Sequence, residues 1–217
     1  MIGPDRTIPV IDETDIPVPN VASKTEKAAD APAWNLPNQV TAVRLIVSAV
    51  VFVMFELRWY RAALVLFLIA ASTDWIDGQL ARRYGLVTQL GRILDPLADK
   101  IVICGSFIYL AAMQEHSRIA AWMAVIVVAR ELAVTVIRSF LEQNGKDFSA
   151  NMPGKLKMVF QCAAVVAALY LLHMRTTATV PSFLPSLVTG LAWLAVLSTI
   201  YSGIIYVFAA ARLVREL

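Results

Sequence analysis

Four aspartates with helical spacing lie in two stretches that are otherwise apolar. Asp74 and Asp77 are three residues apart, and Asp95 and Asp99 are four apart, so each pair occupies one face of a helix. A short polar loop joins the two stretches, so we expect antiparallel neighbouring helices that direct four carboxylates into one volume. Carboxylates at that density suit Mg²⁺, Mn²⁺ or Ca²⁺ rather than zinc, for which nearby histidines or thiolates are expected.

These carboxylates need compensation, because an unpaired aspartate at mid-membrane costs roughly 2.5–3.5 kcal/mol. Bound cations would supply it. One alternative is a set of ion pairs with Arg82, Arg92 or Lys100 that only holds the helices together, although such pairs do not require two carboxylates per helix. A transported cation is another, but the acidic residues gather toward one side instead of following a path across the membrane. The two histidines, His116 and His173, fall at the outer ends of their stretches, where we expect surface or interfacial residues.

Small residues and one arginine accompany the aspartates. Gly78, Ala81 and Arg82 follow the first pair within about one turn, and Gly91 precedes the second pair. Glycine and alanine on a helix face let a ligand approach the backbone closely. Arginine offers a bidentate fork for phosphate oxygens. This face therefore predicts a site for metal ions and a nucleotide.

The complete pattern resembles the signature of the CDP-alcohol phosphotransferase family, and it is present at every position: Asp74-x2-Asp77-Gly78-x2-Ala81-Arg82-x8-Gly91-x3-Asp95-x3-Asp99. The resemblance covers the chain from about Leu36 onward.

The resemblance implies a role for each matching residue. Asp74, Asp77 and Asp95 would ligate two divalent ions, Mg²⁺ or Mn²⁺, with help from Asp99, which would also remove the proton from the attacking hydroxyl. The residues implied to contact the CDP portion are Asn38, Thr41, Asp74, Gly78, Ala81 and Arg82. Metal ions that bridge a diphosphate and a carboxylate that acts as general base fit this chemistry.

The acceptor is predicted from other residues in the same half of the helices. Arg130 and Arg138 are eight residues apart on one helix face, and Lys155 and Lys157 open the next stretch. Together they predict a basic pocket for an acceptor with its own phosphate. Two other interpretations stay open: lysines that only snorkel to the membrane surface, and an Arg130 that pairs with Glu131 or another acid.

Three further stretches resemble the phosphatidylglycerophosphate synthase branch of this family: Leu36-Pro37-Asn38-x2-Thr41-x2-Arg44, Ala129-Arg130-Glu131 with Arg138, and Gly154-Lys155-x-Lys157 with Gln161. That branch transfers the phosphatidyl group of CDP-diacylglycerol to sn-glycerol 3-phosphate and releases CMP. Met158 departs from it, because threonine is more usual there.

Other enzymes share parts of this pattern. Inositol phosphate, serine or phosphatidylglycerol could replace glycerol 3-phosphate as acceptor in the same chemistry. Membrane prenyltransferases also use helix-borne aspartates with magnesium and diphosphate, but Gly78, Ala81 and Arg82 argue against them. CMP release would exclude a prenyltransferase.

The elements that position these residues are predicted to be membrane-spanning helices. With 59% hydrophobic and 16% charged residues, the chain has more apolar surface than a soluble core of its size needs. We predict an all-α bundle of six transmembrane helices within residues 34–217, of about the length that crosses a bilayer. Their approximate ranges are 38–57, 59–84, 90–113, 118–143, 155–173 and 184–211.

Residues 1–33 differ from the rest in being rich in proline and acidic residues, which predicts a disordered cytosolic tail with a short interfacial helix near Trp34. A cytosolic amino terminus places 15 Lys and Arg residues in or toward the cytosolic half and 4 outside it, as the positive-inside rule requires. We therefore expect a bacterial-type inner-membrane protein with its active site on the cytosolic side. The family resemblance suggests a homodimer, and we expect no nucleic-acid partner.

Overall fold

The computed structural model describes the backbone of residues 36–84, 89–143, 152–177 and 179–214. It describes the side chains of residues 42–72, 100–140, 154, 156–177 and 179–212. The predicted disordered tail, residues 1–33, lies outside the described part. Within that part all regular structure is helical, which confirms the all-α prediction.

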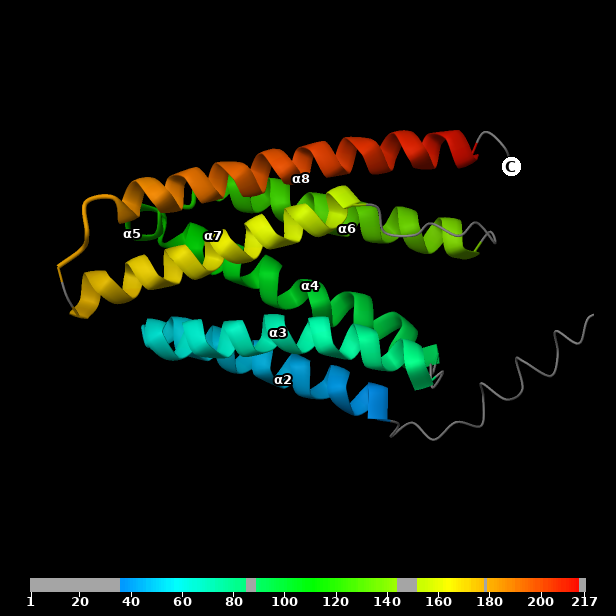
Figure 1. Ribbon diagram of the computed structural model, residues 1–217, viewed down its shortest axis with the longest axis horizontal. Helices are drawn as coiled ribbons and strands as arrows, with labels where there is room; N and C mark the ends of the chain where they lie inside the picture. Colours follow the sequence, from blue (N-terminus) through cyan, green and yellow to red (C-terminus); the bar gives the residue numbers. More distant parts are fainter. Residues whose placement is uncertain (1–35, 85–88, 144–151, 178, 215–217) are drawn as a thin grey trace, which may run out of the picture.

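Each of the six predicted stretches forms a long helix, and one short helix lies between the third and fourth. The helices are α2 (Leu36–Glu56), α3 (Tyr60–Tyr84), α4 (Gln89–Ala112), α5 (Gln114–Ser117), α6 (Ala121–Gln143), α7 (Met152–Thr177) and α8 (Leu184–Val214). The long helices alternate in direction, so their ends gather at two ends of the bundle (Figure 1). We call the end where α3 stops and α4 starts the aspartate end, and the end where α2 turns into α3 the opposite end.

The start of α2 corrects one prediction. The predicted range began at residue 38, but the helix already begins at Leu36 and therefore includes Asn38 in its first turn. Pro37 is tolerated as the second residue because the first amides of a helix have no partner within it.

The short helix α5 lies between α4 and α6, where no helix was predicted. The Ser117 hydroxyl donates to the carbonyl of Leu110 at 2.6 Å and accepts from the amide of Ile119 at 3.1 Å. Arg118 then takes a left-handed conformation with φ 65°, which ends α5. These contacts explain why α6 begins at Ala121 and not at about residue 118.

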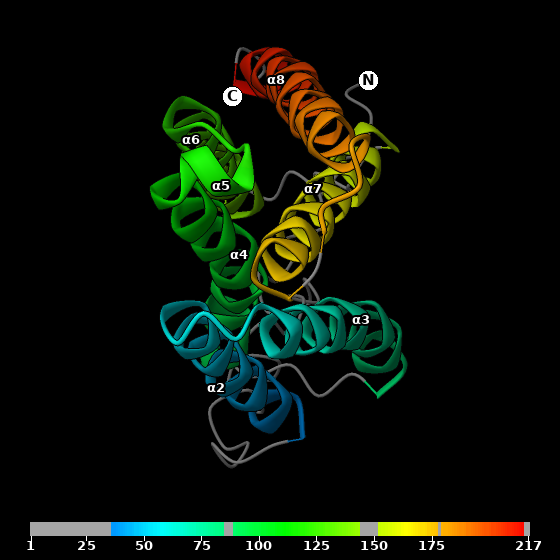
Figure 2. The same ribbon diagram turned by 90° about the vertical axis from the view of Figure 1, so that its left-hand side faces the viewer.

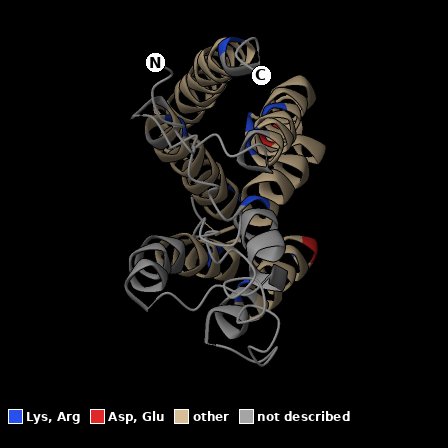
Figure 3. Cartoon of the chain, turned by 90° about the vertical axis from the view of Figure 1, so that its right-hand side faces the viewer, with Lys and Arg blue, Asp and Glu red and all other residues tan. Residues whose placement is uncertain are grey.

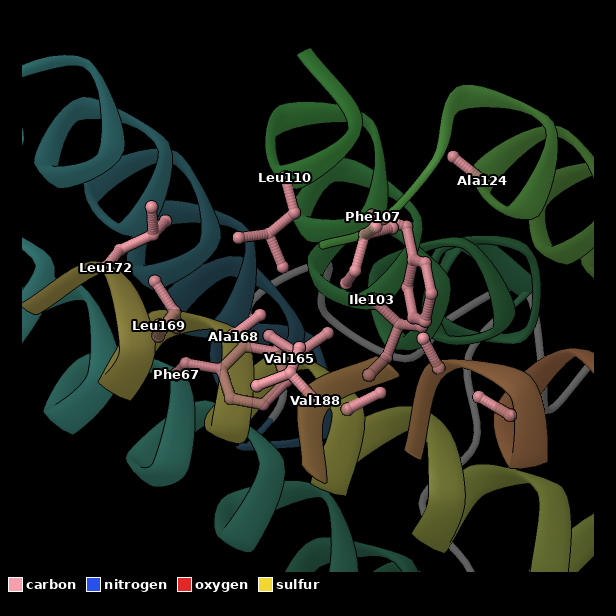
Figure 4. Packing of buried hydrophobic residues seen from close by; sticks show 14 of the residues in the cluster. Phe67, Ile103, Phe107, Leu110, Ala124, Val165, Ala168, Leu169, Leu172 and Val188 are labelled. Atoms are coloured by element: carbon pink, nitrogen blue, oxygen red, sulfur yellow. The ribbon is translucent and has the colours of Figure 1, made fainter. Parts of the chain in front are cut away.

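Helix α4 lies at the centre of the packing and contacts α2, α6 and α7, while α7 packs along α8 and against α3 (Figure 2). The core between these helices is built from aliphatic and aromatic side chains. Phe67 of α3, Phe107 and Leu110 of α4, and Val165 and Leu169 of α7 are all fully buried (Figure 4). Their burial in one cluster fixes the relative positions of α3, α4 and α7.

The exterior of the bundle is also apolar. On α2 the residues Val43, Ile46, Val50 and Val53 are exposed at helical spacing, so they form one stripe along that helix. Exposed apolar surface of this extent is typical of contact with lipid or with another protein. Among the described residues, two segments are long and apolar enough to cross a membrane, Leu156–Thr177 and Leu184–Arg212.

Candidate active site

The structure places the backbone of all four predicted aspartates on helices. Asp74 and Asp77 are in the last three turns of α3, and Asp95 and Asp99 are in the first half of α4. Both pairs therefore belong to the aspartate end. The side chains of residues 73–99 lie outside the described part, and so do those of Gly78, Ala81 and Arg82. Their roles stay predictions.

The first turns of α2 start at the aspartate end as well (Figure 1). The side chains of Asn38 and Thr41 are outside the described part, but Arg44 is described and is 8% exposed. One turn further on, the buried Ser48 hydroxyl donates to the carbonyl of Arg44 at 2.8 Å. Figure 3 looks onto this end and shows Lys and Arg on several of the described helices.

A buried carboxylate, Glu131 of α6, is the centre of a polar cluster between α6, α7 and α8. Its side chain is 6% exposed, and its Oε1 accepts a hydrogen bond from the ammonium group of Lys157 on α7. Its other oxygen, Oε2, lies 3.5 Å from Nη1 of Arg130. Two cations therefore share one carboxylate, and the three side chains together carry a net charge of +1.

Gln161 connects this cluster to α8. Its amide nitrogen lies 3.3 Å from Oε1 of Glu131 and 3.0 Å from the hydroxyl oxygen of Thr199, and donates to both. Gln161 is 1% exposed and Thr199 is fully buried. Buried amides and hydroxyls that are paired in this way hold the three helices in one arrangement.

Arg130 is held by α8 from two sides. Its Nη2 donates to the hydroxyl of Ser202 at 2.5 Å, and its guanidinium carbon lies 5.3 Å from the centre of the Tyr206 ring, within range of a cation–π interaction. Gly203 makes room for this side chain, because a Cβ at that position would lie 3.2 Å from Cγ of Arg130. Ser202, Gly203 and Tyr206 of α8 therefore fix the position of the guanidinium group together.

The predicted basic pocket is brought together only in part. Arg130 and Lys157 both form ion pairs with Glu131. The structure thus contains the Arg130–Glu131 pair that was one of the alternatives. Lys157 is 7% exposed and paired, which rules out a snorkelling side chain. Arg138 is exposed two turns from Arg130, and the side chain of Lys155 lies outside the described part.

Sequence reasoning missed the contribution of α8. Thr199, Ser202, Gly203 and Tyr206 follow one another at spacings of three, one and three residues, so they share one face of the helix. Polar residues at helical spacing inside an apolar stretch were a signal that this face meets polar groups of other helices.

Comparison with known proteins identifies the class. The family model for CDP-alcohol phosphatidyltransferase matches residues 34–201, and the chain belongs to this family. It is thus a transferase of phospholipid biosynthesis, and members of the family generally depend on divalent metal ions.

Its relatives are more specific. The chain is 37% identical over 187 residues to a CDP-diacylglycerol–glycerol-3-phosphate 3-phosphatidyltransferase of Bacillus subtilis strain 168, which covers 78% of this chain and 92% of the relative. Proteins of the same name from Pseudomonas fluorescens and Salmonella choleraesuis are 36% and 34% identical, over 52% and 63% of this chain and 58% and 78% of their own lengths. The two long apolar segments and these bacterial relatives together indicate a membrane protein.

Proposed function

We propose that this chain transfers the phosphatidyl group of CDP-diacylglycerol to sn-glycerol 3-phosphate and releases CMP. The observation that carries the proposal is the similarity to the Bacillus subtilis enzyme of that name over 92% of its length. The aspartates on α3 and α4 suit the metal-bound diphosphate of CDP-diacylglycerol. The buried cations Arg130 on α6 and Lys157 on α7 suit the phosphate of the acceptor.

Four carboxylates would hold the divalent ions. Asp74, Asp77, Asp95 and Asp99 lie on the adjoining helices α3 and α4, and a set of carboxylate oxygens fits Mg²⁺ or Mn²⁺. When bound, such ions neutralise the diphosphate as the phosphorus–oxygen bond to CMP breaks. We assign the CDP contacts to Asn38, Thr41, Asp74, Gly78, Ala81 and Arg82.

The acceptor hydroxyl oxygen attacks the phosphatidyl phosphorus while the bond to the CMP oxygen breaks. The proton of that hydroxyl passes to the Asp99 carboxylate, which acts as general base. No other proton acceptor is needed, because CMP leaves as a phosphate anion.

The acceptor phosphate is proposed to bind Arg130 and Lys157, with Arg138 and Lys155 at its margin. The contacts of Glu131 sharpen this proposal, since the carboxylate holds both cations within the bundle and offsets one of their charges. The remaining positive charge then attracts an anionic acceptor. Each cation is already in a fixed position before the acceptor binds.

Six spans, a cytosolic amino terminus and an active site on the cytosolic side of a bacterial-type inner membrane complete the proposal, with residues 34–217 as one membrane domain and the chain as a homodimer. Helix α6 contains Arg130, Glu131 and Arg138, so apolarity alone does not mark it as a span. The first two of these charges face each other inside the bundle and not lipid.

The test is a product assay with the purified chain, CDP-diacylglycerol, Mg²⁺ or Mn²⁺, and a panel of acceptors. We expect CMP release and a phosphatidylglycerophosphate product that depend on glycerol 3-phosphate. If the chain instead uses inositol phosphate, serine or phosphatidylglycerol, the proposed acceptor is wrong and the proposed transfer chemistry still holds. Release of diphosphate without CMP would overturn the reaction itself.

A further inference from the structure

A cavity of about 720 Å³ opens at the opposite end of the bundle, away from the aspartates. It lies between the turn that joins α2 to α3 and the last turns of α7; Figure 2 is viewed from this end. The residues of its lining that matter here are Arg58, Trp59, Arg61, Val65, Leu66 and His173. The reaction proposed above uses none of them.

Two of these residues are cations for which the described part of the chain supplies no ion-pair partner. Arg58 and Arg61 are both exposed, and neither makes an ion pair within the described residues. Glu56 is exposed two residues before Arg58, and it too makes no described ion pair. The lining residues include no acid, so the cavity presents two positive charges and attracts an anion.

The walls beside these charges are apolar. Trp59 is 63% exposed and Val65 is 51% exposed, although both are large hydrophobic side chains. Tyr60 is buried, and its hydroxyl donates to the Met113 sulfur at 3.5 Å, which anchors the turn to the end of α4. A free phosphate ion would leave this apolar surface uncovered.

Two threonine hydroxyls of α7 line the cavity but do not offer their protons to an anion. The hydroxyls of Thr176 and Thr177 both donate to the carbonyl of His173 at 2.8 Å, so these hydroxyl protons are already used. The two guanidinium groups are the charged donors of this lining and suit phosphate oxygens, and the ring N–H groups of Trp59 and His173 are further donors.

From these contacts we infer that the cavity binds an anionic phospholipid, with its headgroup phosphate between Arg58 and Arg61 and an acyl chain along Val65 and Leu66. Tryptophan and tyrosine side chains are enriched where a membrane protein meets the membrane–water interface. This lipid is distinct from the substrate, because it lies at the end of the bundle remote from the aspartates. The inference rests on the proposed membrane-spanning arrangement and not on the acceptor or the chemistry.

Trp59 offers a local readout. The full chain is placed in vesicles that contain brominated phosphatidylglycerol or brominated phosphatidylcholine, and the quenching of Trp59 is taken as the difference between the chain and its Trp59→Phe variant. The ratio of the two quenching curves gives the relative binding constant at this site. We expect a preference for the anionic lipid that falls about fivefold when either arginine is changed to glutamine, as for loss of one cation near an anionic lipid surface.

Arg118→Gln is the matched control. Arg118 is exposed at the same end and has a left-handed backbone like that of Arg58, with φ 65° and 57°, but it does not line the cavity. We expect this variant to keep the lipid preference, and all three glutamine variants to keep transferase turnover.

Three results would overturn the inference: equal quenching by the two lipids in the parent chain, an equal loss of preference in Arg118→Gln, or loss of the preference when inorganic phosphate replaces chloride at the same ionic strength. The last result would assign the site to a free anion. Because lipid preference and CMP release are separate readouts, failure of one leaves the other interpretable.

Discussion

Glu131 is the residue on which the described polar cluster depends. It accepts from Lys157 and Gln161 through one oxygen and lies beside Arg130 with the other. Without its charge, two buried cations would remain with no counterion, and removal of one partner from a buried pair costs about 3–5 kcal/mol. Glu131 therefore stabilises the fold and positions both proposed acceptor-binding cations.

We predict that Glu131→Gln lowers the free energy of unfolding by about 3 kcal/mol. Unfolding of the detergent-solubilised chain by heat or denaturant, followed by helical circular dichroism, measures this. Adding Lys157→Met should recover more than half of the loss, because it removes one of the two unpaired cations. The exposed Glu115→Gln serves as control, with an expected change within about 0.5 kcal/mol. Similar stability of Glu131→Gln and the control would show that the carboxylate is not needed.

Ser202→Ala is expected to act on acceptor binding. It removes the hydroxyl that accepts from Nη2 of Arg130 at 2.5 Å, and a hydrogen bond to a charged group contributes about 1.5–3 kcal/mol. The KM for glycerol 3-phosphate should rise about tenfold or more, with a smaller change in kcat. Initial rates at varied acceptor concentration separate the two constants.

Ser198→Ala is the control for this variant, because its hydroxyl donates to the carbonyl of Ala195 in its own helix at 3.0 Å. Its KM should stay within about twofold of the parent value, as expected for a substitution that touches no ligand-binding group. An equal KM in both variants would remove Arg130 from the acceptor site.

Asp99→Asn is expected to abolish transfer while the chain still inserts and folds. The amide retains the shape of the side chain but cannot accept the hydroxyl proton, and it is a weaker ligand for a divalent ion. CMP release by the purified variant, together with its helical circular dichroism, tests this. Near-normal turnover would remove Asp99 from the role of general base.

The chemistry of individual residues was predictable from the sequence where the pattern is local. The aspartate pairs are three and four residues apart, and Arg130 adjoins Glu131, so these relations can be seen along one helix. Ser202 is 72 residues from Arg130, and its contact depends on how α8 packs on α6. No pattern within α6 contains that information.

At the scale of the elements, the close approach of α2 and α4 depends on Gly105. A Cβ at this position would overlap the ring of Phe52, at 2.5 Å from its Cε1. That ring cannot move freely, because it stacks on Tyr109 with centroids 5.6 Å apart, and Tyr109 also stacks on the fully buried Phe55 at 5.4 Å. The aromatic stack and the glycine together set the distance between the two helices.

Gly105→Ala should therefore destabilise the bundle by about 1–3 kcal/mol, the usual cost of overpacking a core. Gly190→Ala on α8 is the control, because nothing lies within 4 Å of its added methyl group. Alanine favours a helix over glycine by up to about 1 kcal/mol, so the control should be neutral or slightly stabilising. The midpoint of thermal unfolding measures both effects. Equal shifts of the midpoint in the two variants would contradict this account.

Hydrophobic runs predicted the helices well, since each of the six stretches overlaps a long helix. Their ends were less predictable. Helix α7 begins at Met152 and extends to Thr177, beyond the expected 155–173, and α5 was missed. Four residues carry little periodicity, and α5 depends on the contacts of Ser117 with Leu110 and Ile119.

At the scale of the molecule, charged groups lie inside the bundle or at its ends, and apolar side chains cover much of its exterior. The described carboxylate inside the bundle, Glu131, is paired, and the exposed helix faces are largely apolar. The backbone positions of the aspartates share one end. This distribution suits an enzyme whose lipid substrate keeps its acyl chains in the membrane while its headgroup reaches one aqueous side.

Helix α6 provides the decisive test of that arrangement. Its 23 residues span roughly 35 Å at 1.5 Å per residue, enough to cross the hydrocarbon layer. Glu115 and Ser139 are exposed near its two ends. In a background without Cys104 and Cys162, we predict that a membrane-impermeant maleimide added to intact spheroplasts labels Glu115→Cys and leaves Ser139→Cys unlabelled until the membrane is opened. Labelling of both from the same side would show that α6 does not cross the membrane, because a crossing helix of this length must separate its ends. The reverse pattern would keep the spans and place the aspartate end, with the active site, on the outer side.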